Sequence, residues 1–123
     1  MADKRVLLVD DELLIRYTLA QTLQREGVEI VAVASAEAAL TVLEGGAFDL
    51  CFLDVRLPGM DGLQALRLIR RHRPHTQVVL MSGHVAGTHD LDPAERPLDF
   101  LEKPFDLGRV RALADHVLGA PAS

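Results

Sequence analysis

The stretch CFLDVRLPG, residues 51–59, runs from apolar side chains directly into the carboxylate of Asp54 and then leaves through a proline-glycine turn. Short apolar runs that are bounded by turn residues are typical of buried strands. A strand that ends on a charge raises the question of what the charge does there. The answer depends on where the end of this strand lies in the fold.

The composition predicts one globular domain with ordinary protein partners. The chain has 123 residues, of which 49% are hydrophobic and 25% are charged, and one domain of this size can bury a core. The net charge of -5 disfavours non-specific binding to nucleic acid or to an anionic membrane. The start MADKRVLLVDDE is unlike a signal peptide, and we expect a cytoplasmic protein. Cys51 is the single cysteine, so it is expected to be a small buried hydrophobe.

Short apolar runs alternate with segments of helical spacing, without an internal repeat or an interior linker. The apolar runs predict strands at residues 5–9, 29–33, 50–53, 77–81 and 99–101. Apolar side chains at helical spacing predict helices around Ile15, Leu19 and Leu23; around Ala36, Ala39, Leu40 and Leu43; around Leu63, Leu66 and Ile69; and around Leu107, Val110, Leu113, Ala114 and Val117.

Residues that favour helix ends lie at the borders of these segments. Ser35 and Asp106 are placed as N-caps, and glycines at 27, 45, 46 and 119 are placed as C-terminal stops. Strands that alternate with helices imply a parallel sheet covered by helices on both faces. The expected architecture is therefore a three-layer, doubly wound α/β fold.

The carboxyl ends of the strands in such a sheet lie at one edge, where ligands bind at the topological switch point. Asp54 ends the third predicted strand at that edge, and Asp10 and Asp11 directly follow the first. Ser82 follows the fourth strand and Lys103 follows the fifth. The second strand ends on a capping hydroxyl, and in the strand order 2-1-3-4-5 it is outermost. The polar and charged side chains at the ends of the other four strands should then converge around Asp54.

This set of side chains favours magnesium-dependent phosphoryl transfer. Three carboxylates gathered in one place repel one another unless a cation holds them ionised. Hard oxygen ligands suit Mg²⁺, which keeps several waters and takes a phosphate oxygen as a partner. An aspartate can act as the nucleophile, while a metal and a lysine neutralise the oxygens of the transferred group and a hydroxyl donates to one of them.

Four motifs in order, VDDE, FLDVRLPGMDGL, VVLMSGH and DFLEKPF, resemble the receiver domain of bacterial two-component response regulators. The resemblance covers essentially the whole chain. It implies a flavodoxin-like five-stranded parallel sheet, with a receiver domain at residues 1–119 and a tail or truncated linker at residues 120–123. It also implies Mg²⁺ as the cofactor.

By that resemblance Asp54 is the phosphoacceptor. Asp10 and Asp11 are the acid pair that holds Mg²⁺ together with Asp54 and the backbone carbonyl of Arg56. The side chains of Arg56 and His84 lie at the rim of the site in this assignment. The two acids of the pair have an alternative role, because acidic residues also favour the start of a helix.

The resemblance assigns the remaining site residues to catalysis and switching. Lys103 pairs with the phosphoryl group, and Ser82 is the switch hydroxyl. The peptide between Lys103 and Pro104 is expected to be cis, which aims the lysine. Phe100 takes the position of the aromatic residue that reports activation, and it lacks the hydroxyl that would mark either state.

The implied function is a phosphorylation-dependent switch in a phosphorelay. The donor is a sensor histidine kinase or a phosphotransfer protein, and the target is an output domain or a partner protein. The chain would be a phosphoacceptor that catalyses its own phosphorylation and dephosphorylation, with no direct contact to nucleic acid or membrane. The resemblance leaves open a homodimer that forms on phosphorylation. The arginines at 67, 70, 71 and 73 are interpreted as a solvated helix face.

Three alternatives share part of this pattern. A pseudo-receiver is an unphosphorylated interaction module of the same fold, and its mark would be the loss of an acid or of the lysine. An aspartyl-phosphate hydrolase places its nucleophile after the first strand in a D-x-D pattern, whereas this chain has adjacent aspartates there. A flavodoxin-like cofactor binder needs a phosphate-binding loop after the first strand, where this chain has three acids.

The segment HVAGTHDLDPAERPLDFLEKPF departs from the receiver pattern between the fourth and fifth strands. Asp92 and Pro93 resemble a helix start, but Pro97 ends any helix there. We expect residues 85–98 to form at most a turn or two of helix and to be mobile in the unphosphorylated state. The fourth helix of the fold would then be short or irregular, and partner choice would depend more on the last helix, residues 107–118.

Overall fold

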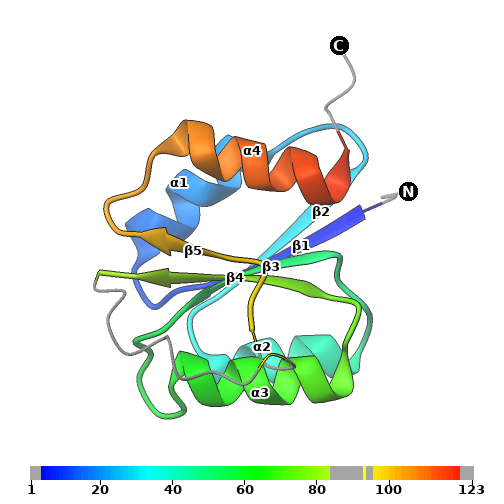
Figure 1. Cartoon of the computed structure of the whole chain (residues 1–123), viewed down its shortest axis with the longest axis vertical. Coiled ribbons are helices and arrows are strands. Elements are labelled where there is room, and N and C mark those ends of the chain that lie inside the picture. The colour runs from blue at the N-terminus through cyan, green and yellow to red at the C-terminus, as the bar shows by residue number, and fades with distance from the viewer. Residues whose placement is uncertain (1–3, 84–92, 94–95, 120–123) are drawn as a thin grey trace.

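The computed structural model describes residues 4–83, 93 and 96–119, which form one parallel sheet with helices on both faces (Figure 1). The sheet has five strands in the order β2-β1-β3-β4-β5, as predicted. The strands are β1 (Lys4–Val9), β2 (Val28–Val33), β3 (Leu50–Asp54), β4 (Gln77–Ser82) and β5 (Asp99–Glu102). The helices in the described part of the chain are α1 (Leu13–Leu23), α2 (Ala36–Glu44), α3 (Gly62–His72) and α4 (Leu107–Leu118).

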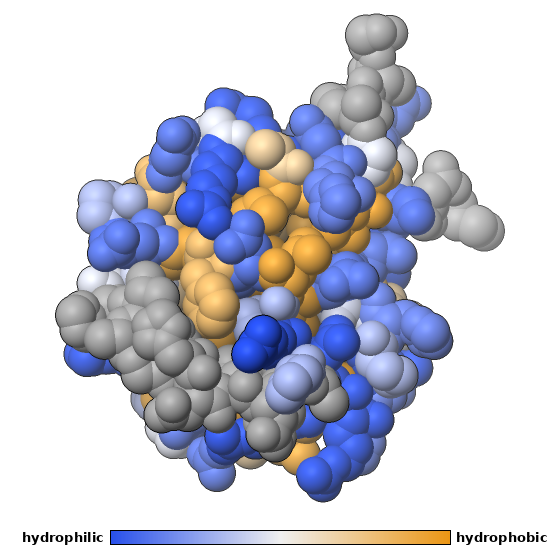
Figure 2. Space-filling view, viewed as in Figure 1, coloured by the Kyte–Doolittle hydropathy of each residue, from blue (hydrophilic) through white to orange (hydrophobic). Residues whose placement is uncertain are grey.

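Two apolar layers hold the sheet between its helices. Helices α1 and α4 cover one face and α2 and α3 the other (Figure 1). Successive side chains of a strand point to opposite faces, so Val6 and Leu8 of β1 join the α1/α4 layer while Leu7 and Val9 join the α2/α3 layer. In the view of Figure 2, apolar side chains gather between α4 and the strands, with hydrophilic ones around them. The central strands are therefore apolar along both faces.

Strand β3 is the most deeply buried element and leads straight into the site. Its residues from Leu50 to Leu53 have no exposed surface, and Asp54 is 5% exposed. Burial raises the pKa of the Cys51 thiol to about 12, because the thiolate would lie in an apolar layer. Cys51 is therefore a buried apolar side chain, as expected from the sequence.

The predicted caps are confirmed at two helices, α2 and α4, and one predicted stop is wrong. Ser35 Oγ accepts a hydrogen bond from Ala38 N at 3.1 Å, and Asp106 Oδ1 accepts one from Gly108 N at 2.8 Å. Gly119 ends α4 with a φ of 86°. Gly27 does not end α1, which stops at Leu23. Its φ of 81° serves the turn into β2, where a left-handed residue is needed.

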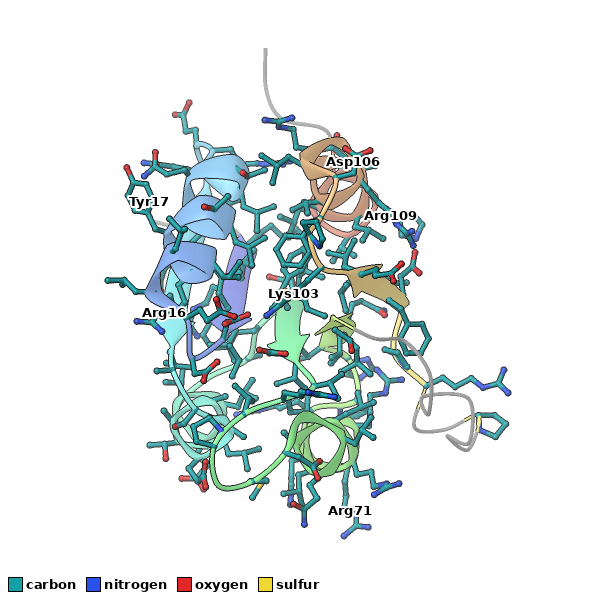
Figure 3. All side chains as sticks on the ribbon, turned by 90° about the vertical axis from the view of Figure 1, so that its left-hand side faces the viewer. Arg16, Tyr17, Arg71, Lys103, Asp106 and Arg109 are labelled. Atoms are coloured by element: carbon teal, nitrogen blue, oxygen red, sulfur yellow. The ribbon has the colours of Figure 1, made fainter. Side chains whose placement is uncertain are left out.

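Part of the arginine-rich end of α3 is structural and not a purely solvated face. Arg70 Nη1 donates to the carbonyl oxygens of Pro74 at 3.3 Å and Thr76 at 3.2 Å. Arg73 Nε donates to the carbonyl oxygen of Leu43 at 2.9 Å. These two guanidinium groups therefore donate hydrogen bonds to backbone carbonyls around the C-terminal end of α3. Arg71 is exposed and points away from the molecule (Figure 3).

The predicted short helix between β4 and β5 falls largely on residues 84–92 and 94–95, which lie outside the described residues, so it stays a prediction. The described chain resumes at Arg96, and Leu98 N donates to the carbonyl oxygen of Val78 at 2.6 Å just before β5 begins. None of the described helices has the length and the apolar character that crossing a membrane would require.

Candidate functional site

Four polar side chains from different strands meet at the carboxyl edge of the sheet. Asp10 follows β1, Asp54 ends β3, Ser82 ends β4 and Lys103 follows β5. The first three are almost fully buried, with 0%, 5% and 6% of their surface exposed. Figure 3 faces this edge, with Lys103 at the centre and Arg16 of α1 beside it. The peptide between Lys103 and Pro104 is cis.

The ammonium group of Lys103 lies between two buried carboxylates. Its Nζ atom is 2.7 Å from Asp10 Oδ2 and 3.1 Å from Asp54 Oδ2, and it lies 3.8 Å from Glu12 Oε1. An ammonium has three protons to donate. The positive charge therefore offsets the repulsion that Asp10 and Asp54 would exert on each other.

The second oxygen of each buried carboxylate is also bound. Asp10 Oδ1 accepts a hydrogen bond from Glu12 N at 2.9 Å, and Asp54 Oδ1 accepts one from Arg56 N at 3.1 Å. Arg16 Nη1 donates to the backbone carbonyl oxygen of Asp10 at 2.8 Å. These bonds fix both carboxylates in orientation, because each is held at both oxygens.

Burial and the contact between Asp54 and Lys103 shift the pKa values of these two residues in opposite directions. Burial raises the pKa of Asp54, although the hydrogen bonds from Lys103 and from Arg56 N partly oppose it, and the charge of Asp10 adds to the rise. For Lys103, burial lowers the pKa, but the hydrogen bonds to Asp10 and Asp54 outweigh it and the pKa is raised. Lys103 is therefore charged at neutral pH, and further positive charge near Asp54 would favour the ionised carboxylate.

Three acidic side chains form a cluster with the spacing of a metal site. One carboxylate oxygen from each of Asp10, Asp11 and Glu12 lies within 4.8 Å of the others. Asp10 is buried, whereas Asp11 and Glu12 are exposed. Hard oxygen ligands at a partly hydrated edge fit Mg²⁺, which retains several waters. Glu12 was not among the ligands predicted from the sequence, although it directly follows the acid pair in VDDE.

The alternative role of the acid pair, starting the first helix, finds little support in the geometry. Helix α1 begins at Leu13, and its N-cap residue Glu12 makes no side-chain cap hydrogen bond. Its first turn contains no acidic residue. The side chain of Asp10 instead accepts from the amide of Glu12 and from Lys103. Asp10 therefore links the start of α1 to Lys103 and is not a cap of the helix alone.

The predicted switch and rim residues have different surroundings. Ser82 is buried, and its carbonyl oxygen accepts a hydrogen bond from Lys103 N at 2.7 Å. Phe100 is half-buried and packs against the α2/α3 layer. Arg56 is exposed and lines an open hollow of about 490 Å³ that Asp11 also borders. His84 lies outside the described residues.

Gly62 is a positioning residue that the sequence did not reveal by itself. It is the first residue of α3, and its N donates to the carbonyl oxygen of Val55 at 2.9 Å. A Cβ atom added there would overlap the carbonyl oxygen of Asp54 and lie 2.7 Å from Val55 Cα. Helix α3 can therefore start directly against the backbone that carries Asp54 only because this residue has no side chain.

Gly62→Ala should reduce the free energy of unfolding by about 1–3 kcal/mol, because the added methyl group meets rigid backbone. It should also slow any reaction at Asp54, since the carbonyl of that residue must shift. Urea unfolding followed by circular dichroism measures the first effect. Gly45→Ala is the matched control, since its Cβ would meet only the Val42 carbonyl oxygen at an ordinary 3.5 Å. Equal stability of the two variants would contradict the close approach.

Comparison with known proteins places this chain in one family. The sequence model of the response regulator receiver domain matches residues 6–115. The chain is 46% identical to the response regulator protein FleR of Pseudomonas aeruginosa over 120 residues, which are 94% of this chain and 25% of FleR. It is 33% identical to the DNA-binding transcriptional regulator NtrC of Proteus hauseri, covering 96% of this chain and 25% of that protein. The chain thus spans about a quarter of the length of these relatives.

Solved structures agree with the family and the fold. The response regulator protein TrrA of Thermotoga maritima, in complex with Mg²⁺-BeF, has a TM-score of 0.82 and 31% identity, covering 93% of this chain and 98% of that one. NtrX of Brucella abortus has a TM-score of 0.80 and 37% identity, covering 96% of this chain and 27% of that one. From the family match, these identities and its strand order, this chain belongs to the response regulator receiver domains.

Proposed function

We propose that this chain is a phosphorylation-dependent switch that accepts a phosphoryl group on Asp54 from a sensor histidine kinase or a phosphotransfer protein. The observation that carries the proposal is the buried Asp54 carboxylate, which Lys103 Nζ approaches to 3.1 Å beside the acidic cluster. We propose residues 1–119 as the receiver domain and residues 120–123 as a tail or truncated linker. The phosphorylated surface acts on an output domain or a partner protein.

The reaction at Asp54 is a transfer from a donor phosphohistidine. A carboxylate oxygen of Asp54 forms a bond to phosphorus while the bond between phosphorus and the imidazole nitrogen breaks, and the imidazole leaves with the electron pair and takes up a proton. Negative charge then gathers next to Lys103, whose ammonium is already in place to stabilise it. Arg56 N holds the other oxygen of Asp54 in orientation. The chain thus supplies nucleophile, orientation and one positive charge.

Mg²⁺ is the cofactor that the side chains fit. Asp10, Asp11, Asp54 and the backbone carbonyl of Arg56 would hold it, with the carboxylate of Glu12 close enough to contribute. When bound, Mg²⁺ supplies positive charge that neutralises the carboxylates and the phosphoryl oxygens. Ser82 and Phe100 lie on the neighbouring strands β4 and β5. In this proposal they respond to the phosphoryl group by changing conformation, and this change alters the surface that partners bind.

The donor protein has an apolar surface available beside the acidic cluster. The exposed large apolar side chains of the described chain are Leu13, Leu14 and Tyr17, which are 71%, 72% and 61% exposed. All three belong to the first half of α1, directly after Glu12. Figure 3 shows Tyr17 on the outer side of this helix. Exposed apolar groups gathered next to a site favour a protein contact there, which fits a protein as phosphodonor.

Incubation with acetyl phosphate or phosphoramidate and Mg²⁺ tests the proposal. The intact mass should increase by one phosphoryl group, and the gain should require Mg²⁺. A pseudo-receiver would gain no mass under these conditions. An aspartyl-phosphate hydrolase would release inorganic phosphate from many free phosphate esters over repeated turnovers. Either of those results would replace the switch as the function.

Asp11→Ala should weaken Mg²⁺ binding by about tenfold or more, which corresponds to about 1.4 kcal/mol, because it removes a proposed ligand. Labelling with acetyl phosphate should slow accordingly at low Mg²⁺ concentration. Ser82→Ala is the comparison, since it removes a switch contact and leaves the proposed ligands in place. Titration calorimetry measures the affinity, and mass spectrometry over time measures the labelling rate. Equal affinities and rates in the two variants would show that Asp11 is not a ligand.

A further inference from the structure

A contact between α2 and the loop after Asp54 is not explained by the assignments above. We define the acceptor loop as residues 55–61, between β3 and α3. Glu37 is the second residue of α2, and its Oε2 accepts a hydrogen bond from Met60 N at 3.2 Å. We infer that Glu37 is a positioning residue that holds the acceptor loop from outside and thereby tunes the affinity of the site for a divalent cation.

The two ends of the acceptor loop are fixed by the strands and helix that it joins. Val55 N donates to the carbonyl oxygen of Met81 in β4 at 2.9 Å. At the other end, Asp61 Oδ1 accepts from Gln64 N at 2.9 Å and caps α3. Leu57 packs into the α2/α3 layer and is 9% exposed. Between Leu57 and Asp61 the side chain of Met60 is partly buried against the same layer, and Glu37 adds a hydrogen bond to its backbone.

Gly59 shows how closely the Glu37 carboxylate approaches the loop. Its φ is 77°, a conformation that favours glycine. A Cβ atom added to Gly59 would lie 2.6 Å from Glu37 Oε2. The carboxylate therefore lies against the Gly59 backbone as well as accepting from Met60 N. The loop and the side chain fit each other at two consecutive residues.

Helix α2 gives Glu37 a rigid base. Ser35 caps the helix, and the neighbouring residues Ala36 and Ala39 are fully buried under the sheet. The Glu37 side chain itself is exposed, so its hydrogen bond competes with water and contributes modestly. A contact of this strength adjusts the loop and does not decide whether the domain folds.

The acceptor loop matters to the site because it contains Arg56, whose carbonyl is the proposed cation ligand. The same loop and Asp11 line the open hollow of about 490 Å³ beside Asp54. Leu57 directly follows Arg56, so without the bond at Met60 the loop beyond Arg56 would be held by apolar packing alone until Asp61. This looser hold would spread the positions of the Arg56 carbonyl and make the site less well ordered for a cation. This step of the inference rests on the proposed function, whereas the contact between Glu37 and the loop does not.

Three variants test the inference by titration calorimetry with Mg²⁺. Glu37→Ala should weaken Mg²⁺ binding about three- to fivefold, as expected for the loss of one exposed hydrogen bond. Glu37→Gln should stay within about twofold of the unchanged protein, because the amide oxygen can still accept from Met60 N. Glu44→Gln changes the same charge at the other end of α2 and should have no effect. Equal weakening in the Ala and Gln variants would assign the effect to charge and overturn the inference.

A second measurement follows the loop without any cation. Amide hydrogen exchange of Met60 in EDTA should be faster in Glu37→Ala and unchanged in Glu37→Gln. Faster exchange together with an unchanged Mg²⁺ affinity would overturn the link to the site. If the unchanged protein neither binds Mg²⁺ nor gains a phosphoryl group, the proposed function fails instead, and the exchange of Met60 still reports whether Glu37 holds the loop.

Gly59→Ala provides an independent check on the contact. Alone, it should accelerate Met60 exchange because the methyl group displaces the Glu37 carboxylate. Combined with Glu37→Ala, it should add less than its effect in the unchanged protein, since the carboxylate is already absent. Fully additive effects would show that the two residues do not touch and would overturn the inference.

Discussion

Asp54→Asn should gain no phosphoryl mass from acetyl phosphate and Mg²⁺ under conditions in which the unchanged protein is labelled once. The amide lacks the negatively charged oxygen that attacks phosphorus. The asparagine oxygen can still accept from Lys103 Nζ or from Arg56 N, so the fold should remain intact. Intact-mass spectrometry measures the labelling, and circular dichroism checks the fold.

Asp61→Asn is the matched control for this experiment. Asp61 is exposed and caps α3 through its Oδ1, and asparagine is an equally good N-cap. This variant should be labelled like the unchanged protein. Labelling of Asp54→Asn at the same rate as the control would rule out Asp54 as the phosphoacceptor and would require another carboxylate at the site.

Asp54→Asn should also change how the free energy of unfolding depends on pH in EDTA. The pKa of Asp54 is raised above its usual 3.8 in the folded protein. Over the interval between 3.8 and the folded value, the folded protein keeps a proton on Asp54 that the unfolded chain has released. Asp54 therefore costs stability as the pH rises through this interval. Asp54→Asn should lose less stability than the unchanged protein over the same pH range.

Lys103→Met should have the largest effect on the metal-free protein. Among the described residues it removes the only positive charge within hydrogen-bond distance of the Asp10 and Asp54 carboxylates, and it leaves these two buried carboxylates facing each other. Removing one partner of a buried ion pair costs about 3 kcal/mol or more. Labelling should also slow by about a hundredfold, since one preorganised donor to the developing charge is lost. Urea unfolding in EDTA and mass spectrometry measure the two effects.

Mg²⁺ separates this electrostatic role from simple packing. A divalent cation bound by the same carboxylates would offset their repulsion, so millimolar Mg²⁺ should stabilise Lys103→Met more than the unchanged protein. Lys4→Met is the control, because it removes a lysine charge at the start of β1, at the opposite end of the strand from Asp10. If Lys103→Met were as stable as Lys4→Met in EDTA, or if Mg²⁺ stabilised both equally, the ion pair would not control the site.

Hydrophobic patterning in the sequence is enough to predict the sheet and the edge at which the site lies. The run from Leu50 to Leu53 is continuously apolar, as expected for a strand that is buried on both faces. Such a run can be recognised from consecutive residues alone. The alternation of such runs with helical spacing predicted a parallel sheet covered on both faces, and the structure confirms the strand order expected for that doubly wound fold. Since parallel strands end at one edge, Asp54 and Lys103 were predicted as neighbours although they are 49 residues apart.

Which atoms meet at that edge depends on how the folded elements pack together. Lys103 Nζ lies between Asp10 and Asp54, Glu12 joins the acid pair, and Gly62 lies against the Asp54 carbonyl. The bond from Met60 N to Glu37 joins residues that are 23 positions apart. Hydrophobic periodicity records which side of an element is buried, but it carries no information about the register between elements or the path of a loop. Those contacts follow from how the helices pack on the sheet, and the chemistry of the site depends on them.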